Sequence, residues 1–447
     1  MKIHAIGGYD EVGKNMTALE IGEDVIIFDC GLYLPAIVGV EENERIPTER
    51  GMRALGALPD DLYLDKRGLR KKVRAILISH AHLDHVGGAP FLAQRYDAPV
   101  LSTPYTIEIL KALLKDAQIS IPNKLIGVNL NSSYVIKGKS GEYKVEFLNM
   151  THSVIQSSCI AVHTPEGVVL YANDYKFDNT PVLGDKPNYA RLKELSKKGV
   201  TAFIVDCLYA PDDRKTPSEK IARGLLEDVL FTTDNHNSAL VITTFSSHIA
   251  RLKTITEFSK RLGREVVFVG RSIGKYLKAA RNLGLANFSR GLKIASFRRE
   301  IERALKRVEK NRNKYVVVCT GHQGEPGSIL DRISRNKMPF KLRKGDHVIF
   351  SSRTIPTPVN EANRANLEKR LKKFNVRIFD NIHVSGHGGR EDLRDFIRIV
   401  KAKNVIPSHG DLTKTSAGAE LAQEEGYVLH ESVHLMKNQS VLEVKNK

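Results

Sequence analysis

The sequence predicts an α/β protein with more than one domain, and three observations support this. Its 447 residues exceed the usual span of a single hydrophobic core. Its composition, with 41% hydrophobic and 27% charged residues, is that of an ordinary globular chain. Short apolar runs dominate residues 1–210, whereas helical and strand patterns alternate over residues 211–380, which predicts a parallel, doubly wound sheet.

The first 210 residues contain apolar runs of strand length, separated by turns that carry glycine. These runs predict strands at residues 2–6, 16–21, 25–29, 73–79, 145–149, 159–163, 168–172 and 202–205. The run at 73–79, VRAILIS, is the pattern of a fully buried strand. Residues 35–70 carry many charges together with glycine and proline, so we expect an irregular insertion there.

Beyond residue 211 the hydrophobic period alternates between that of a helix and that of a strand. Helices are predicted at residues 218–231, 248–262, 271–283, 297–314 and 360–374. Strands are predicted at residues 239–244, 265–269, 314–319, 347–350 and 376–379. The last part of the chain returns to strand, helix and strand at 404–407, 415–424 and 427–429.

The chain is strongly basic. Its 69 lysines and arginines against 51 acidic residues give a formal net charge of +18, which favours a polyanionic partner such as nucleic acid. The most basic stretch is residues 297–314, where Ile301, Leu305 and Val308 recur at helical spacing. This stretch predicts either a solvated helix face or an electrostatic platform for a nucleic-acid backbone.

Several classes of protein are excluded by the composition. No apolar run reaches the roughly 18–20 residues that a membrane span needs, and the first residues contain no apolar signal core. The four cysteines, Cys30, Cys159, Cys207 and Cys319, lie far apart and show no C-x-x-C spacing. This argues against a disulfide framework and a thiolate zinc site, so we expect a cytoplasmic protein without a membrane partner.

The segment HAHLDH, residues 80–85, directly follows the predicted buried strand. In an extended segment His80 and His82 project to the same side. A following turn can direct Asp84 and His85 to a second position, so that one loop serves two adjacent cations. Imidazole and carboxylate ligands suit Zn²⁺, and also Mn²⁺ where oxygen ligands dominate. The alternative is a polar surface loop whose histidines share no role.

Three further candidate ligands, His152, Asp174 and His409, each lie where a predicted strand ends. Strand ends are where sandwich and α/β proteins assemble their sites. Each of the three alone would favour a structural role over that of a ligand. As a set with HAHLDH they favour a metal centre.

In this order, these residues resemble the metallo-β-lactamase superfamily, whose fold is an αββα sandwich. The resemblance implies two Zn²⁺ per chain, with Mn²⁺ as a substitute in vitro. The ligands of the first ion would be His80, His82 and His152. Those of the second would be Asp84, His85 and His409. Asp174 would bridge both ions, Asp84 would also serve catalysis, and Asp29 would orient the site without binding metal.

Asp174 and His409 lie 235 positions apart, and the predicted doubly wound sheet occupies much of that interval. An α/β domain inserted before the last ligand resembles the β-CASP nucleases, which act on RNA or DNA. We therefore expect residues 1–210 and 381–447 to form the metallo-β-lactamase domain, and residues 211–380 to form an inserted β-CASP domain.

Two residues match further motifs of the β-CASP nucleases, Asp206 in motif A and His387 in motif B. A phosphodiester has no good leaving group unless the departing oxygen is protonated, so His387 suits the role of general acid. Asp206 would orient His387 or tune its pKa. The alternative is that His387 caps the helix predicted from residue 390.

Six further segments resemble the ribonuclease J family: residues 10–15, 245–249, 270–272, 320–326, 350–356 and 383–387. The resemblance covers nearly the whole chain from residue 3 to about 411 and matches the shorter archaeal form. It implies a 5′→3′ exoribonuclease that prefers a 5′ monophosphate, and some members of that family also cut internally. One departure is Asn173, which stands where a glycine is common.

Several matched residues could form a pocket for the 5′ phosphate. Arg271 and Ser272 open a predicted helix, where backbone amides and a guanidinium can meet an anion. The remaining candidates are Ser247, His248, Ser352, Arg353, His383, Ser385 and the amide of Gly386. Each of them alone suits a cap or a turn equally well.

The favoured function is therefore a 5′→3′ exoribonuclease that acts in RNA decay and maturation on single-stranded RNA. The alternatives are a β-CASP endoribonuclease of the cleavage-factor type and a small-molecule metallo-hydrolase, which would need neither the inserted domain nor the basic excess. A binding protein without activity would have lost ligands, whereas all seven are present. The sequence leaves open whether the chain forms a homodimer or joins an RNA-decay complex.

Overall fold

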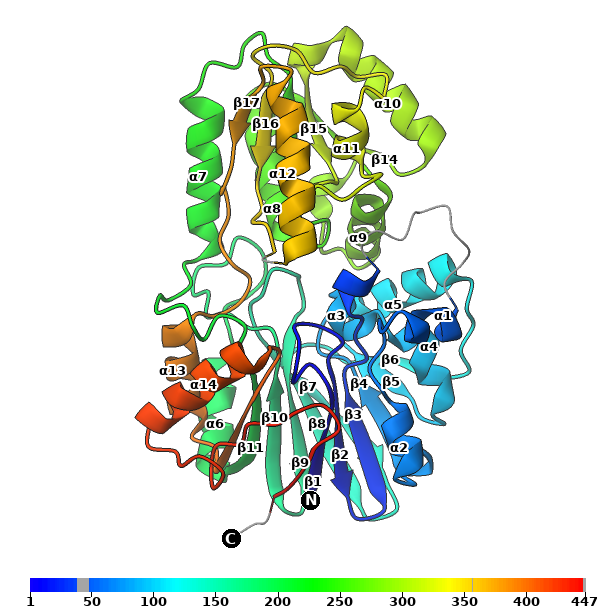
Figure 1. Cartoon of the computed structure of the whole chain (residues 1–447), viewed down its shortest axis with the longest axis vertical. Coiled ribbons are helices and arrows are strands. Elements are labelled where there is room, and N and C mark those ends of the chain that lie inside the picture. The colour runs from blue at the N-terminus through cyan, green and yellow to red at the C-terminus, as the bar shows by residue number, and fades with distance from the viewer. Residues whose placement is uncertain (38–47, 356, 445–447) are drawn as a thin grey trace.

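The computed structural model describes residues 1–37, 48–355 and 357–444, which fold around three β-sheets (Figure 1). The first sheet has the strand order β19-β1-β2-β3-β4-β5-β6, and the second has the order β18-β11-β10-β9-β8-β7. The third has the order β14-β13-β15-β12-β16-β17, and every neighbouring pair in it is parallel. The predicted α/β class, with a sandwich and a separate parallel sheet, is confirmed.

The first two sheets form the sandwich. The first consists of β1 (Lys2–Gly7), β2 (Met16–Ile21), β3 (Asp24–Phe28), β4 (Val73–Leu77), β5 (Val100–Ser102), β6 (Leu125–Gly127) and β19 (Val441–Glu443). The second consists of β7 (Ser132–Lys137), β8 (Glu142–Asn149), β9 (Ser158–Thr164), β10 (Gly167–Ala172), β11 (Val200–Asp206) and β18 (Asn404–Ser408). The alternating apolar residues of the two sheets meet in a shared core, in which the rings of Phe28 and Tyr171 stack with centroids 4.8 Å apart.

Helices cover both outer faces of the sandwich (Figure 1). On the first sheet lie α1 (Glu49–Ala54), α2 (Leu62–Lys66), α4 (Ala89–Leu92) and α5 (Pro104–Ala117). On the second lie α6 (Tyr189–Lys198), α13 (Arg390–Val400) and α14 (Leu412–Glu424). Short 3₁₀ helices lie at Leu34–Ala36, Arg70–Lys72, Ala93–Arg95, Asn287–Ser289 and Arg312–Lys314. The layers are thus helix, sheet, sheet and helix.

The third sheet lies above the sandwich in Figure 1. Its strands are β12 (Leu240–Thr243), β13 (Glu265–Val269), β14 (Lys293–Ala295), β15 (Tyr315–Cys319), β16 (His347–Phe350) and β17 (Arg377–Phe379). One face packs against α7 (Glu219–Phe231), α8 (Ile249–Arg261) and α9 (Arg271–Asn282). The other packs against α10 (Arg298–Lys310), α11 (Ile329–Ser334) and α12 (Pro358–Lys372). Residues 211–380 remain our proposed bounds for this domain.

Two expectations about individual elements are wrong. The segment 35–70 is not irregular throughout, because α1 and α2 form within it. Thr48 caps α1, and α2 packs through its buried residues Tyr63 and Leu64. Residues 38–47 of that segment lie outside the described residues. No strand forms at 427–429, where Leu429 makes only an isolated bridge; β19 instead pairs antiparallel with β1.

Every helix in the described part of the chain is too short or too polar to cross a membrane.

The carboxyl ends of β3, β4, β8, β10, β11 and β18 gather at the edge of the sandwich that faces the third sheet (Figure 1). The predicted metal ligands, together with Asp29 and Asp206, follow these strand ends, so the fold brings them into one region.

Candidate metal centre

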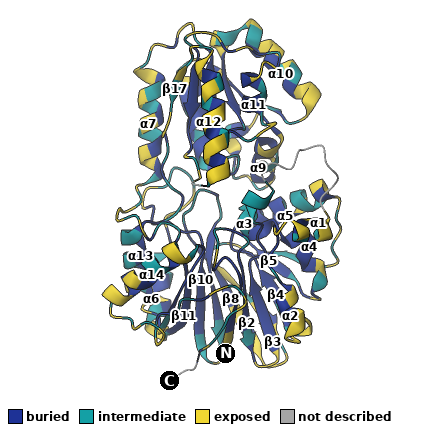
Figure 2. Cartoon of the chain, viewed as in Figure 1, coloured by how far each residue is buried: buried dark blue, intermediate teal, exposed yellow. Residues whose placement is uncertain are grey.

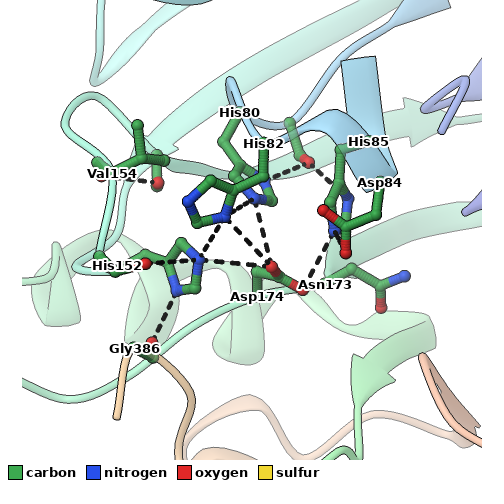
Figure 3. Close-up of polar contacts among 12 residues, drawn as sticks. His80, His82, Asp84, His85, His152, Val154, Asn173, Asp174 and Gly386 are labelled. Atoms are coloured by element: carbon green, nitrogen blue, oxygen red, sulfur yellow. Dashed lines mark hydrogen bonds and ion pairs between the residues drawn. The ribbon is translucent and has the colours of Figure 1, made fainter. Parts of the chain in front are cut away.

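The HAHLDH segment leaves β4 and turns into the short helix α3 (Leu83–Val86). His82 precedes the helix in an extended conformation, with φ −75° and ψ 148°. Asp84 and His85 lie inside the helix, so they project in a different direction from His80 and His82. Figure 3 shows the two pairs on opposite sides of Asp174.

The ligand atoms gather into two groups that share Asp174. The first group is His80, His82, His152 and Asp174, and the second is Asp84, His85, Asp174 and His409. Within each group the ligand atoms all lie within 4.8 Å of one another. Donor atoms bound at about 2.1 Å to one tetrahedral zinc ion would lie about 3.4 Å apart, so the groups are compact enough for a cation.

Asp174 turns one carboxylate oxygen toward each group (Figure 3). Its Oδ2 atom lies 3.2 Å from His80 Nε2 and 3.3 Å from His152 Nε2. Its Oδ1 atom lies 3.2 Å from His85 Nε2 and 3.4 Å from His409 Nε2. Oδ1 is buried and accepts no hydrogen bond within the described residues. An unsatisfied buried oxygen among imidazole nitrogens fits a divalent metal, so the residues present suit zinc.

Hydrogen bonds hold the outer ring nitrogens of three ligands, and the inner ring nitrogens face Asp174. Three such bonds are His85 Nδ1 to Asp29 Oδ2 at 2.7 Å, His152 Nδ1 to Gly386 O at 2.6 Å and His409 Nδ1 to Asn15 Oδ1 at 2.9 Å. The ring of His82 has the opposite orientation. Its Nδ1 atom faces the other ligands of the first group, and its Nε2 atom lies 3.1 Å from Ser247 Oγ. Outer hydrogen bonds of this kind fix the ring orientation of metal ligands.

The charge state of the histidines also suits a metal. Burial lowers the pKa of His80 to about 4 and that of His152 well below its usual value. Neutral imidazole is the form that binds metal. At His85, burial is outweighed by nearby carboxylates, Asp174 foremost, which raise its pKa well above the usual value. This concentration of negative charge is what a divalent cation would neutralise.

Three site residues have a left-handed backbone within two residues of a strand end: Asp29 with φ 57°, Asp174 with φ 63° and His409 with φ 59°. For residues other than glycine this conformation costs on the order of 1 kcal/mol, and it persists where the surroundings hold it. The conformation lets each side chain leave its strand end sharply and enter the centre.

His387 and Asp206 meet beside the second group. The His387 Nδ1 atom lies 2.8 Å from Asp206 Oδ2, and its ring is nearly parallel to that of His409. Burial would lower the pKa of His387, but Asp174 and Asp206 raise it to about 9. The N-cap of α13 is Gly389, so His387 does not cap that helix. Because Asp206, His387 and His409 could themselves hold an ion, zinc content must be measured in any test of His387.

The metal groups lie in a cleft of about 1390 Å³ that residues of the sandwich and of the third-sheet domain both line. The candidates for phosphate binding that line it are Ser247, Arg271, Ser272, Arg353, His383, Ser385 and Gly386. His248 and Ser352 lie behind its wall. The His248 Nε2 atom is 3.4 Å from Glu219 Oε2, and Ser352 is fully buried. A role for either in binding phosphate stays a prediction.

Two asparagines that sequence analysis did not place in the site support its ligands. Asn15 donates from Nδ2 to the carbonyl of Asp84 at 3.0 Å, while its Oδ1 atom meets His409. Asn173 accepts a hydrogen bond from Ser408 Oγ at 2.7 Å, so the residue that replaces a common glycine has a role here. The sequence did offer a signal, because Asn15 ends the matched segment 10–15 and Asn173 directly precedes the candidate ligand Asp174.

Comparison with known families covers most of the chain. A model described as "Metallo-beta-lactamase superfamily" matches residues 9–229. A model described as "Ribonuclease J, beta-CASP domain" matches residues 237–367. A third, "Zn-dependent metallo-hydrolase RNA specificity domain", matches residues 373–435. The second match covers β12 to β16 of the third sheet, and the first and third matches flank it along the chain.

Individual proteins are similar over their full length. The chain is 42% identical to ribonuclease J of Methanocaldococcus jannaschii, over 98% of this chain and 97% of that one. It is 41% identical to ribonuclease J of Pyrococcus abyssi, over 99% and 97% respectively. A solved structure of a protein of unknown function from Enterococcus faecalis covers 99% of both chains with a TM-score of 0.65 and 17% identity, which shows a shared fold.

Proposed function

The chain belongs to the ribonuclease J family of zinc-dependent metallo-hydrolases, and on this premise we propose that it degrades RNA as a 5′→3′ exonuclease. It hydrolyses phosphodiester bonds, releases 5′-mononucleotides and prefers a 5′-monophosphate end. The observation that supports this most is the pair of donor groups around Asp174, set in a cleft beside His387 and Asp206. RNA decay and maturation in the cytoplasm is the setting that we propose for it.

Two zinc ions are part of the proposal. His80, His82 and His152 would hold one ion with Asp174 Oδ2. Asp84, His85 and His409 would hold the other with Asp174 Oδ1. Zinc bound there supplies Lewis acidity for a phosphoryl oxygen and lowers the pKa of water.

His387 supplies the proton that the departing oxygen needs. Its Nδ1 atom is hydrogen-bonded to Asp206 Oδ2, which leaves Nε2 to carry the transferred proton. Asp206 is 3% exposed, so its charge acts on the ring with little screening by water. Asp206 therefore keeps the ring oriented and favours its protonated form, as a general acid requires.

The cleft supplies groups for the 5′ phosphate. Arg271 and Ser272 form the first turn of α9, whose N-terminal amides and partial positive charge favour an anion. Arg353, Ser385 and the amide of Gly386 line the same cleft. A phosphate bound by this set would fix the end of the strand and so determine which bond meets the metal groups.

The decisive experiment uses RNA labelled at its 3′ end and carrying a 5′ monophosphate, triphosphate or hydroxyl, with Zn²⁺ or Mn²⁺ supplied. We expect mononucleotide release that is fastest from the monophosphate. Internal cuts that do not depend on the 5′ group would instead support an endoribonuclease of the cleavage-factor type.

Asp174→Asn, which removes a ligand common to both groups, should lose zinc and activity together.

The role of His387 has its own test. His387→Ala should lower turnover by about 10²–10⁴-fold, the usual contribution of a general acid, while zinc content stays that of the unchanged protein. Zinc content is measured by elemental analysis and turnover under saturating RNA. The exposed His236, far from these groups in sequence and not in the cleft, provides the control variant His236→Ala. Loss of zinc in His387→Ala would show that His387 is a ligand and overturn its role as an acid.

A further inference from the structure

Helix α10 carries a stripe of basic residues that face away from the core. The stripe consists of Arg299, Arg303, Lys306, Arg307 and Lys310, all of them exposed (Figure 2). At 3.6 residues per turn they fall within about 100° of the helix circumference. The buried face of the helix, formed by Ile301, Leu305 and Val308, lies on the opposite side.

The acids of α10 leave this stripe unneutralised. Glu300 accepts hydrogen bonds from backbone N–H groups at the helix start, at 3.0 and 3.2 Å. Glu302 pairs with Arg298 at 3.1 Å. Glu309 pairs with Arg312 at 2.7 Å, beyond the end of the helix. In the described part of the chain none of the five stripe residues forms an ion pair. Glu300 and Glu302 lie three or four residues from members of the stripe, but the backbone and Arg298 engage them instead. The stripe therefore presents exposed charge of one sign, which favours a polyanion.

The first turn of α10 opens into the cleft that holds the metal groups. Phe297, Arg298 and Ile301 all line that cleft. Phe297 is 66% exposed, the highest value among the large hydrophobic residues that the structure describes. From there α10 runs along the outer side of the third-sheet domain (Figure 1). An exposed aromatic ring beside an arginine is a pattern that stacks on a base and contacts its phosphate.

We propose that Phe297 stacks on a base at the mouth of the cleft and that the α10 stripe binds the RNA backbone beyond it. This rests on the proposed RNA substrate and adds a second binding surface outside the catalytic cleft. The 13 residues of α10 span about 20 Å, enough to meet several phosphates. The contact is electrostatic, so it tolerates any sequence and weakens with salt. RNA too short to leave the cleft does not reach the stripe.

The stripe is tested with the triple variant Arg299→Gln, Arg303→Gln and Lys306→Gln. The matched control is Lys193→Gln, Lys197→Gln and Lys198→Gln on α6, where three exposed lysines lie outside the cleft. Both triples and their parent carry His387→Ala and bound zinc, so that RNA stays intact while its affinity is measured by fluorescence anisotropy. The probes are single-stranded RNAs of about 5 and about 25 nucleotides at several salt concentrations.

We expect the α10 triple to bind the longer RNA at least about tenfold more weakly at low salt than its parent. The slope of log affinity against log salt should fall by about 2, because each phosphate contact to a single strand contributes about 0.7. The shorter RNA and the α6 triple should show the parent's values. An unchanged slope, an equal loss in the α6 triple or an equal loss for the shorter RNA would overturn the proposal. Vesicles of anionic phospholipid serve as a further probe. If the α10 triple lost affinity for the vesicles but not for RNA, that result would also overturn the proposal.

Phe297 is tested separately, because stacking carries no charge. Phe297→Ala should weaken binding of the longer RNA about tenfold with no change in the salt slope, and Phe297→Tyr should restore it. Equal affinity in all three proteins would remove Phe297 from the proposal.

The proposed function is judged by a different readout, cleavage of the shorter RNA by the unchanged chain. Absence of cleavage together with α10-dependent binding would reject the exonuclease alone. Cleavage together with α10-independent binding would reject this inference alone.

Discussion

Asp29 would bind no metal in the proposed centre, yet four hydrogen-bonding groups converge on its carboxylate. Ser79 donates from its backbone N–H at 2.7 Å and from its hydroxyl at 2.9 Å. The hydroxyl of Tyr171 donates at 2.8 Å, and His85 Nδ1 lies at 2.7 Å. A carboxylate held by this many donors cannot rotate freely, so it fixes the ring of His85 with Nε2 toward Asp174.

Asp29→Asn should therefore weaken zinc binding without changing the ligand set. An amide replaces one acceptor oxygen by a donor, which disfavours the His85 tautomer that presents a free Nε2 atom. We expect affinity for zinc to fall by about 10–100-fold, measured by competition with a chelating dye. Asp24→Asn is the control, because Asp24 is an equally buried carboxylate in the same sheet that binds Arg74 and Tyr143 instead. An equal loss of zinc affinity in both variants would contradict the orienting role.

At the scale of elements, one carboxylate joins two strands to a covering helix. Glu146 on β8 accepts two hydrogen bonds from Arg191 on α6, at 2.8 and 2.9 Å, and lies 2.5 Å from His163 Nε2 on β9. Burial opposes ionisation of Glu146, but Arg191 and His163 outweigh it and lower its pKa to about 2. The ionised carboxylate is thus more stable in the folded chain than in the unfolded one.

The contribution of Glu146 to stability should depend on pH. Since its pKa falls from 4.5 to about 2 on folding, the stabilisation is complete above about pH 4.5 and is lost as the pH falls toward 2. Glu146→Gln should lower the free energy of unfolding by about 1–2 kcal/mol at pH 7, allowing for screening by solvent, and by much less near pH 2. Urea unfolding in the presence of a chelator keeps metal content constant. Glu142→Gln, exposed on the same strand, is the control, and a difference that stays constant with pH would refute the argument.

Elements were predictable where the pattern was local and strong. The buried strand β4 and the helix α10 follow from hydrophobic period alone. The strand β19 was missed because its three residues carry no period of their own, and it forms only because β1 offers it an open edge. The helices α1 and α2 were missed because each contains only one or two buried apolar residues among charged ones, which is too few to show a helical period.

At the scale of the whole molecule, a fully buried arginine ties the third-sheet domain to the chain that returns to the sandwich. Arg251 on α8 binds both carboxylate oxygens of Glu219, at 2.6 and 2.9 Å, and the carbonyls of Ser351 and Ile382, at 2.8 and 2.9 Å. The backbone N–H of Glu219 in turn donates to Asp178, which belongs to the sandwich segment. Although burial opposes it, Arg251 holds the pKa of Glu219 well below its usual value.

Arg251→Met should destabilise the chain strongly, because it leaves the buried Glu219 carboxylate without its partner. The expected loss is about 3–5 kcal/mol in the free energy of unfolding, measured by urea denaturation at pH 7. Adding Glu219→Gln should recover part of the loss by removing the unpaired charge. Arg261→Met, on the same helix and paired with Glu227 at the surface, should cost at most about 1 kcal/mol. No recovery in the double variant would show that the loss comes from packing.

The sequence by itself determined the composition of the centre: the imidazoles and carboxylates, their order along the chain and their positions after strands. It also determined the basic excess and the alternation that produces the third sheet, because hydrophobic period and residue chemistry are local properties. Only the tertiary structure decided that Asp174 gives one oxygen to each group, that Asp206 reaches His387 and that His248 lies behind the cleft wall. These contacts join residues far apart in the sequence, and they form only when packing of the sheets and helices repays the entropy of closing long loops.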